Sequence, residues 1–158
     1  MKRLCFALIL ACAGLMSLNA ATVSVLVIEA GLSPGTTKTR SASIWESGMM
    51  DAFFDAGHIV SNAPSIQVDE FSRSLTPEIN MEFDEARVGG ADFFVLIFLN
   101  HPKDDLDHVK DVIIQVFKVS TRELLFEFSE PSRAGLSTKE EFQNIKKTAG
   151  NILPRLKG

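Results

Sequence analysis

The chain has 158 residues, of which 46% are hydrophobic and 23% are charged. This composition suits one folded domain and excludes a chain that is mostly disordered. A formal charge of −4 gives no basic surplus of the kind that nucleic-acid binding needs, and the complete lack of tyrosine excludes any enzyme that depends on one.

The first 20 residues have the order of a secretory leader. Basic residues open the chain, residues 4–18 are almost wholly apolar, and small residues follow at Ala20 and Ala21. We predict cleavage after Ala20, which leaves an α/β domain of residues 21–158 in the periplasm or outside the cell. The apolar stretch is too short and too poorly flanked for a comfortable membrane span.

The leader also contains a second, alternative signal. Residues 9–12 (ILAC) resemble a bacterial lipobox, which would make Cys12 the lipidated first residue of an outer-membrane lipoprotein. Cleavage after Ala20 would instead remove both cysteines and two basic residues, so that the mature charge becomes −6. Such a domain has no disulfide and no cysteine nucleophile or ligand, and its stability must come from its core.

Hydrophobic periodicity predicts alternating strands and helices in the mature chain. In chain order we expect a strand over residues 22–28, a helix from Ser43 to Gly57, a strand over 58–62, a helix from Thr76 to Gly89, a strand over 92–99, strands over 112–119 and 124–128, and a helix from Ser137 to Pro154. Residues 29–42 and 63–76 are predicted to be irregular.

Each predicted helix begins at a capping signal. Ser43 with Glu46, and Ser137 with Glu140, have capping-box spacing. Thr76 and Pro77 combine an N-cap with a first-turn proline. The three helices should therefore start at these positions.

The connections predict the topology. Right-handed crossovers make the first three strands parallel, and the short turn at residues 120–123 makes the last two an antiparallel hairpin. We therefore predict a three-layer α/β domain (β-α-β-α-β-β-β-α) with three helices and a mixed five-stranded sheet in the order 2-1-3-4-5. The long connections, which are residues 29–42, 63–76, 100–111 and 130–136, should share one edge, the long-loop rim, where ligands of open α/β sheets bind.

Two motifs on the long-loop rim resemble catalytic signatures, but each lacks a required residue. Residues 31–35 (GLSPG) match a nucleophile elbow, yet Pro34 follows the serine and has no N–H for an oxyanion hole. Residues 35–39 (GTTKT) resemble a phosphate loop, but no glycine directly precedes Lys38. A Gly/Pro turn and a solvated loop explain these segments, although Lys38 and Arg40 could attract an anion.

Residues 101–108 hold the densest group of potential metal ligands. Two imidazoles and three carboxylates fall within these eight residues, and they could bind a divalent ion. The spacing matches no zinc pattern, however, and Lys103 and Lys110 would repel the ion. A polar hairpin tip explains the same residues, so we expect neither a metal nor another cofactor.

The candidate binding residues lie on or beside the long-loop rim. Trp45, near the start of the first helix, is either a core residue or an exposed interface anchor. We predict no catalytic residue. The full candidate binding set is Lys38, Arg40, Trp45, Arg73, His101, Asp104, Asp105, Asp107, His108 and Arg133.

Several segments resemble a recurring bacterial envelope domain. Residues 90–96 (GADFFVL) are similar to its "GADY-like" entry to the central strand, and residues 119–125 (VSTRELL) to its "V-x-T-G-E-like" turn, with Arg122 in place of glycine. The strand at 23–30 and residues 51–64 also fit its pattern. Members include the amino-terminal domain of TolB, the periplasmic domain of the curli secretion channel and lipoprotein activators of penicillin-binding proteins. The resemblance implies fold and compartment, and it transfers no functional residue.

Together these features favour an exported, non-enzymatic adaptor or accessory module of the bacterial cell envelope. Its expected partner is another envelope protein or a second copy in a homo-oligomer, bound through the long-loop rim or an adjoining helix face. A membrane contact is expected only if Cys12 is lipidated. The alternative is a periplasmic protein, in one form a hydrolase, that binds a small ligand or a metal through residues 100–111.

Overall fold

The computed structural model describes residues 20–33, 35, 37–72, 74–102, 105–106, 108–131 and 135–156. Its elements are β1 (Thr22–Ala30), α2 (Arg40–Asp55), β2 (Ile59–Asn62), β3 (Ile66–Val68), α3 (Pro77–Val88), β4 (Phe93–Asn100), β5 (Asp111–Lys118), β6 (Glu123–Pro131), α4 (Thr138–Ile152) and the 3-10 helix η1 (Leu153–Arg155). None of the helices in these ranges is long and apolar enough to cross a membrane.

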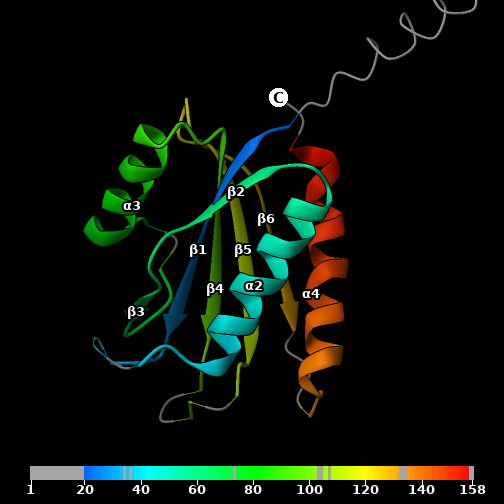
Figure 1. Ribbon diagram of the computed structural model, residues 1–158. Helices are drawn as coiled ribbons and strands as arrows, with labels where there is room; N and C mark the ends of the chain where they lie inside the picture. The colour runs from blue at the N-terminus through cyan, green and yellow to red at the C-terminus, as the bar shows by residue number, and fades with distance from the viewer. Residues whose placement is uncertain are drawn as a thin grey trace, which may run out of the picture.

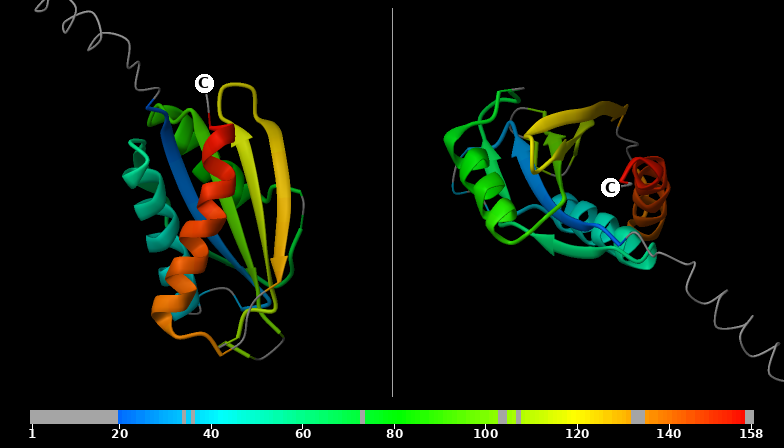
Figure 2. Two further views of the ribbon diagram at one scale, coloured as in Figure 1. Left: turned by 90° about the vertical axis from the view of Figure 1, so that its right-hand side faces the viewer. Right: turned by 90° about the horizontal axis from the view of Figure 1, so that it is seen from above.

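The sheet has the order β2-β1-β4-β5-β6, which confirms the predicted arrangement. β1 pairs in parallel with β2 and β4, and β4, β5 and β6 pair antiparallel. Figures 1 and 2 show α2 and α4 side by side on one face of the sheet and α3 on the other, so the domain has three layers.

One strand was not predicted. β3 lies within residues 63–76, which we expected to be irregular, and it pairs in parallel with the end of β1 at Ile28–Ala30. β2 covers only the start of β1, and Pro64, just beyond it, has no N–H to continue the pairing. The remaining backbone groups of β1 need partners, and β3 supplies them.

The two sides of the central strands build two cores, as the period of two requires. Val23, Val25 and Val27 of β1 face α2 and α4, whereas Leu26 and Ile28 face α3. All five side chains are completely buried. The same alternation continues in β4, so this pair of strands anchors both helical layers.

The start of the first helix differs from the prediction. α2 begins at Arg40, and its N-cap is Thr39, whose side chain accepts a hydrogen bond from the Ala42 N–H at 3.1 Å. The expected Ser43–Glu46 capping box is wrong, because Ser43 lies inside the helix and its hydroxyl donates to the Thr39 carbonyl. The caps expected at Thr76 and at Ser137 with Glu140 are confirmed.

Long and short connections separate to opposite ends of the sheet, as predicted. The described residues of the long connections lie at the end drawn lowest in Figure 1, and the turns at 56–58, 89–92 and 119–122 lie at the other. These long-connection residues are 31–33, 35, 37–39, 63–72, 74–76, 101–102, 105–106, 108–110 and 135–137. In the last turn Arg122 takes the left-handed conformation (φ 56°) that glycine would adopt without strain. Its guanidinium bonds Asp84 and lies 5.0 Å from the ring centroid of Phe83, so the turn is fastened to α3.

Candidate functional site

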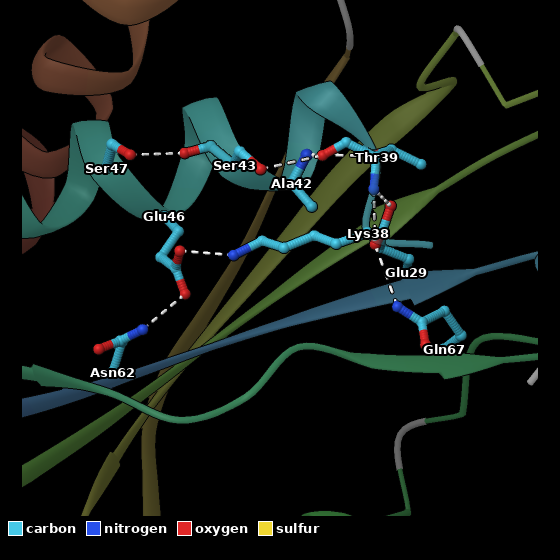
Figure 3. A network of polar contacts seen from close by, with 9 residues as sticks. All are labelled: Glu29, Lys38, Thr39, Ala42, Ser43, Glu46, Ser47, Asn62 and Gln67. Carbon is cyan, nitrogen blue, oxygen red and sulfur yellow. Dashed lines mark hydrogen bonds and ion pairs between the residues drawn. The ribbon is translucent and has the colours of Figure 1, made fainter. Parts of the chain in front are cut away.

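A fully buried carboxylate organises the long-loop rim. Glu29, near the end of β1, accepts hydrogen bonds from the Thr39 N–H at 3.2 and 3.3 Å and from Gln67 Nε2 at 3.3 Å (Figure 3). Thr39 begins α2 and Gln67 belongs to β3. One side chain therefore fixes two connections of the rim relative to the central strand.

His101 brings a third connection to the same carboxylate. Its Nε2 lies 3.5 Å from Glu29 Oε2, and both side chains have an exposed fraction of 0%. At this distance Nε2 makes only a long, weak contact with the carboxylate, and it has no closer hydrogen-bond partner among the described residues. The other ring nitrogen, Nδ1, lies 3.0 Å from the His108 carbonyl, which can only accept, so Nδ1 carries a proton.

The charge of Glu29 is set by its donors. Burial raises the pKa of its carboxyl, but the contacts with His101, Thr39 and Gln67 outweigh this effect and hold the pKa below the usual 4.5. Glu29 is therefore ionised at neutral pH, in a place that solvent does not reach. An imidazole and a carboxylate do meet on the rim, but they are sealed within the protein and serve to hold it together.

Glycine at position 31 lets the loop after β1 pass close to the backbone of His101. Gly31 has a φ of +88°, and a Cβ built there would lie 2.6 Å from the His101 carbonyl oxygen. The glycine that resembled part of a nucleophile elbow is thus required by close packing. Its role is structural.

The two basic candidates at the start of α2 are engaged in contacts within the chain. Lys38 Nζ lies 2.5 Å from Glu46 Oε2, and Asn62 Nδ2 donates to Glu46 Oε1 at 3.0 Å (Figure 3). The guanidinium of Arg40 donates to the hydroxyl of Thr138 and so joins the starts of α2 and α4. Both residues fasten elements of the rim to one another.

A hollow of about 300 Å³ opens beside the rim, between α2, α4 and the end of β6. Trp45 lies at its base and is only 8% exposed, so it is a core residue with one edge in the hollow and not an exposed anchor. Burial raises the pKa of Glu141, and Arg40 opposes this effect. The lining residues are Trp45, Glu130, Pro131, Leu136, Glu141, Asn144, Ile145, Lys147, Thr148 and Asn151.

The imidazoles of the 101–108 segment have different partners. His108 Nδ1 lies 2.8 Å from Asp105 Oδ2 at the surface, whereas His101 is buried against Glu29. Within the residues that the structure describes, no three His, Cys, Asp or Glu side chains are grouped to hold a metal. Outside the described residues lie residues 1–19 of the predicted leader, with Cys12, and also Arg73, Asp104, Asp107 and Arg133.

Glu29 and Gln67 were missed by sequence reasoning. Both were assigned to irregular stretches, and the structure places both in strands. A usable signal was present at Glu29, since it is the single charged residue in a run of β-branched and apolar residues that is typical of a buried strand. Glutamate is almost never fully buried without partners, so such a position demands donors nearby.

Comparison with known proteins shows a likeness of fold. No protein-family model matches the chain, and no protein of curated function does. The PelC dodecamer from Paraburkholderia phytofirmans has a similar structure, with a TM-score of 0.52, 15% identity and 89% of each chain covered. A single-residue variant of that PelC gives 0.50, with 14% identity over 82% of this chain and 85% of the other.

TolB from Acinetobacter baumannii also matches, with a TM-score of 0.47 and 9% identity over 88% of this chain and 29% of that one. TolB was among the proteins that the sequence resembled. At the level of fold, this chain has an architecture similar to that of PelC.

Proposed function

We propose that this chain is an exported, non-enzymatic interaction module of the bacterial cell envelope that binds a protein partner through the long-loop rim. The observation that carries the proposal is a contrast within the rim. Its imidazole–carboxylate pair is sealed from solvent, whereas the hollow next to it is open and has Trp45 at its base. A rim held firm from within can present a preformed surface to a partner.

The lining of the hollow supports a protein partner. Trp45, Leu136 and Ile145 provide apolar surface, and charged and amide side chains also line the hollow. An apolar centre with a polar border is the usual anatomy of a protein interface. β6 ends at the hollow and is the last strand of the sheet, so the backbone groups on its outer edge can pair with an extended segment.

Crosslinking tests the proposal. A photoreactive phenylalanine analogue at Leu136, in the full chain made by its native host, should form an adduct with one protein partner. Asn144→Trp fills the hollow and should abolish the adduct, whereas Gln143→Trp, at an exposed neighbour outside the lining, should leave it intact. The proposal fails if no adduct forms, or if the purified protein turns over a substrate.

We propose as partner another envelope protein or a second copy of this chain. The PelC structures of similar fold are dodecamers, which is a precedent for self-association of this architecture. Light scattering on the purified protein separates the two cases. A defined oligomer that Asn144→Trp dissociates would identify the partner as a second copy.

The second candidate function is metal binding through residues 100–111. It is favoured by the exposed pair of His108 with Asp105, because a carboxylate often orients a metal-binding imidazole. A divalent ion that raises the melting temperature of the protein, but not that of His108→Ala, would support this candidate.

A further inference from the structure

A second cavity lies far from the hollow of the rim, between α3 and the edge formed by β1 and β2. It measures about 190 Å³. α3 covers the face of the sheet opposite α2 and α4 (Figure 1), so the two cavities open on different sides and share no lining residue. We call it the β2–α3 cavity; Ser24, Ser61, Asn62, Ala63, Pro64, Glu82, Glu85, Ala86, Gly89 and Ala91 line it.

Two carboxylates of this cavity have no cationic partner. Glu82 and Glu85 stand one helical turn apart on α3, and neither forms an ion pair or a side-chain hydrogen bond with any residue that the structure describes. Asp84, between them in sequence, pairs instead with Arg87 and Arg122. Burial and the charge of Glu85 together raise the pKa of Glu82, which reflects this uncompensated negative charge.

The hydroxyl of a largely buried serine also borders the cavity. Ser24 of β1 is only 4% exposed, and its side chain has no hydrogen-bond partner among the described residues. An unpaired hydroxyl in the wall of a polar cavity is a place for a ligand atom. The ionised carboxylates can only accept hydrogen bonds, and the Ser24 hydroxyl can accept them too. The cavity therefore suits a group that donates several hydrogen bonds and carries positive charge.

Two exposed apolar side chains lie close in sequence to residues that line the cavity. Val88, next to Gly89, is 85% exposed, and Ile59, two residues before Ser61 and so on the same face of β2, is 63% exposed. Glu85 also borders a shallow surface that includes Met81 and Val88. Charged groups within apolar surroundings are typical of the site that receives one anchoring side chain of a protein.

We propose that the β2–α3 cavity binds the cationic side chain of an arginine or lysine that projects from an apolar segment of a partner protein. Its N–H groups bond Glu82, Glu85 and the Ser24 hydroxyl, while its neighbours cover Val88 and Ile59. The cavity is smaller than the roughly 300–1,000 Å³ of typical small-molecule sites, which favours one side-chain tip over a larger ligand. This surface is separate from the long-loop rim, and the proposal for it does not depend on whether the rim binds a partner.

NMR titration of the purified protein with defined probes tests the proposal. The peptide acetyl-Val-Arg-Val-amide should shift the backbone amides of Ser24, Ser61, Glu82 and Glu85 in a saturable manner. The same peptide with neutral citrulline in place of arginine should bind about tenfold more weakly or worse, because it keeps the shape and loses the charge. Absence of saturable shifts at these amides would overturn the proposal.

Variants and a second cation complete the test. Glu82→Gln with Glu85→Gln should weaken peptide binding by about tenfold or more, whereas Glu123→Gln on β6 should leave it unchanged. On saturation with the peptide, the pKa of the Glu82 carboxyl, followed by carbon NMR in the unaltered protein, should fall. Spermidine that binds as tightly as the peptide would overturn the assignment to a protein side chain, since charge alone would then suffice.

Discussion

Glu29 is completely buried and Glu82 is partly buried, and their surroundings shift the pKa of the two carboxyl groups in opposite directions. Glu29 is completely buried, and its donors hold its pKa below the usual value. Glu82 is only partly buried, but it has no donor and faces Glu85, so its pKa is raised. The role of an acidic residue therefore follows from the hydrogen-bond donors around its carboxylate and not from its depth of burial. A satisfied carboxylate holds the structure together, whereas an unsatisfied one is available to a ligand.

Removal of the satisfied carboxylate should have the largest effect. Glu29→Ala leaves the half-buried Thr39 N–H and Gln67 amide, and the buried His101 ring, without their shared partner. We expect a loss of about 1–3 kcal/mol in the free energy of unfolding, measured by urea denaturation. Glu123→Ala, at the exposed start of β6, is the control and should stay within about 0.5 kcal/mol of the unaltered protein. A similar small loss for both variants would show that the Glu29 contacts are unimportant.

The Glu29 carboxylate should also make the stability of the protein depend on pH. Because the pKa of Glu29 is lower in the folded than in the unfolded protein, its contribution is present above about pH 4.5 and is lost as the pH falls through the folded pKa. Urea denaturation across this pH range should show that the free energy of unfolding falls more steeply in acid for the unaltered protein than for Glu29→Gln. Parallel curves would contradict the lowered pKa.

Sequence patterns predicted the fold better than they predicted the rim. The two sheet faces and the caps at Thr76 and Ser137 follow from local periodicity and capping chemistry, which neighbouring residues decide. The strand order follows from the lengths of the connections and the right-handed crossover rule. The start of α2 does not, because Glu29, ten residues earlier, holds the Thr39 N–H and favours Thr39 over Ser43 as the cap.

The other wrong predictions also concern residues whose contacts are distant in sequence. β3 forms because β1 has an unpaired edge, which no feature of residues 66–68 reveals. His101 looked like a surface ligand in a polar loop, and its burial depends on Glu29, which is distant in sequence. Lys38 and Arg40 looked available for a partner for the same reason, since their contacts arise only from the folded arrangement.

A smaller effect should distinguish the two serine/threonine candidates for the cap of α2. Thr39→Ala removes the oxygen that accepts the Ala42 N–H and should cost about 1 kcal/mol. Ser43→Ala removes only a hydroxyl that bonds the preceding turn and should change stability by less than about 0.5 kcal/mol. Urea denaturation of both variants is the measurement. The reverse order would restore Ser43 as the cap.

The smallest expected change in stability is a gain, and it comes from the substitution of Glu82. Glu82→Gln removes the repulsion between Glu82 and Glu85 and should stabilise the protein by about 0.2–0.5 kcal/mol at neutral pH. The gain should disappear in acid, since a raised folded pKa costs stability only as the pH rises above the ordinary value of 4.5. Glu78→Gln, on the same helix but outside the cavity, serves as the comparison in thermal unfolding, and an equal gain there would exclude a specific repulsion.

Hydrogen exchange at the Thr39 amide tests most directly whether Glu29 holds the rim from within. This N–H precedes α2 in a loop, and its acceptor is the Glu29 carboxylate. It should exchange far more slowly than the exposed Thr37 amide, and Glu29→Gln should speed its exchange by about tenfold or more while Phe53 inside α2 keeps its protection. A Thr39 amide that exchanges as fast as Thr37 in the unaltered protein would contradict a preformed rim.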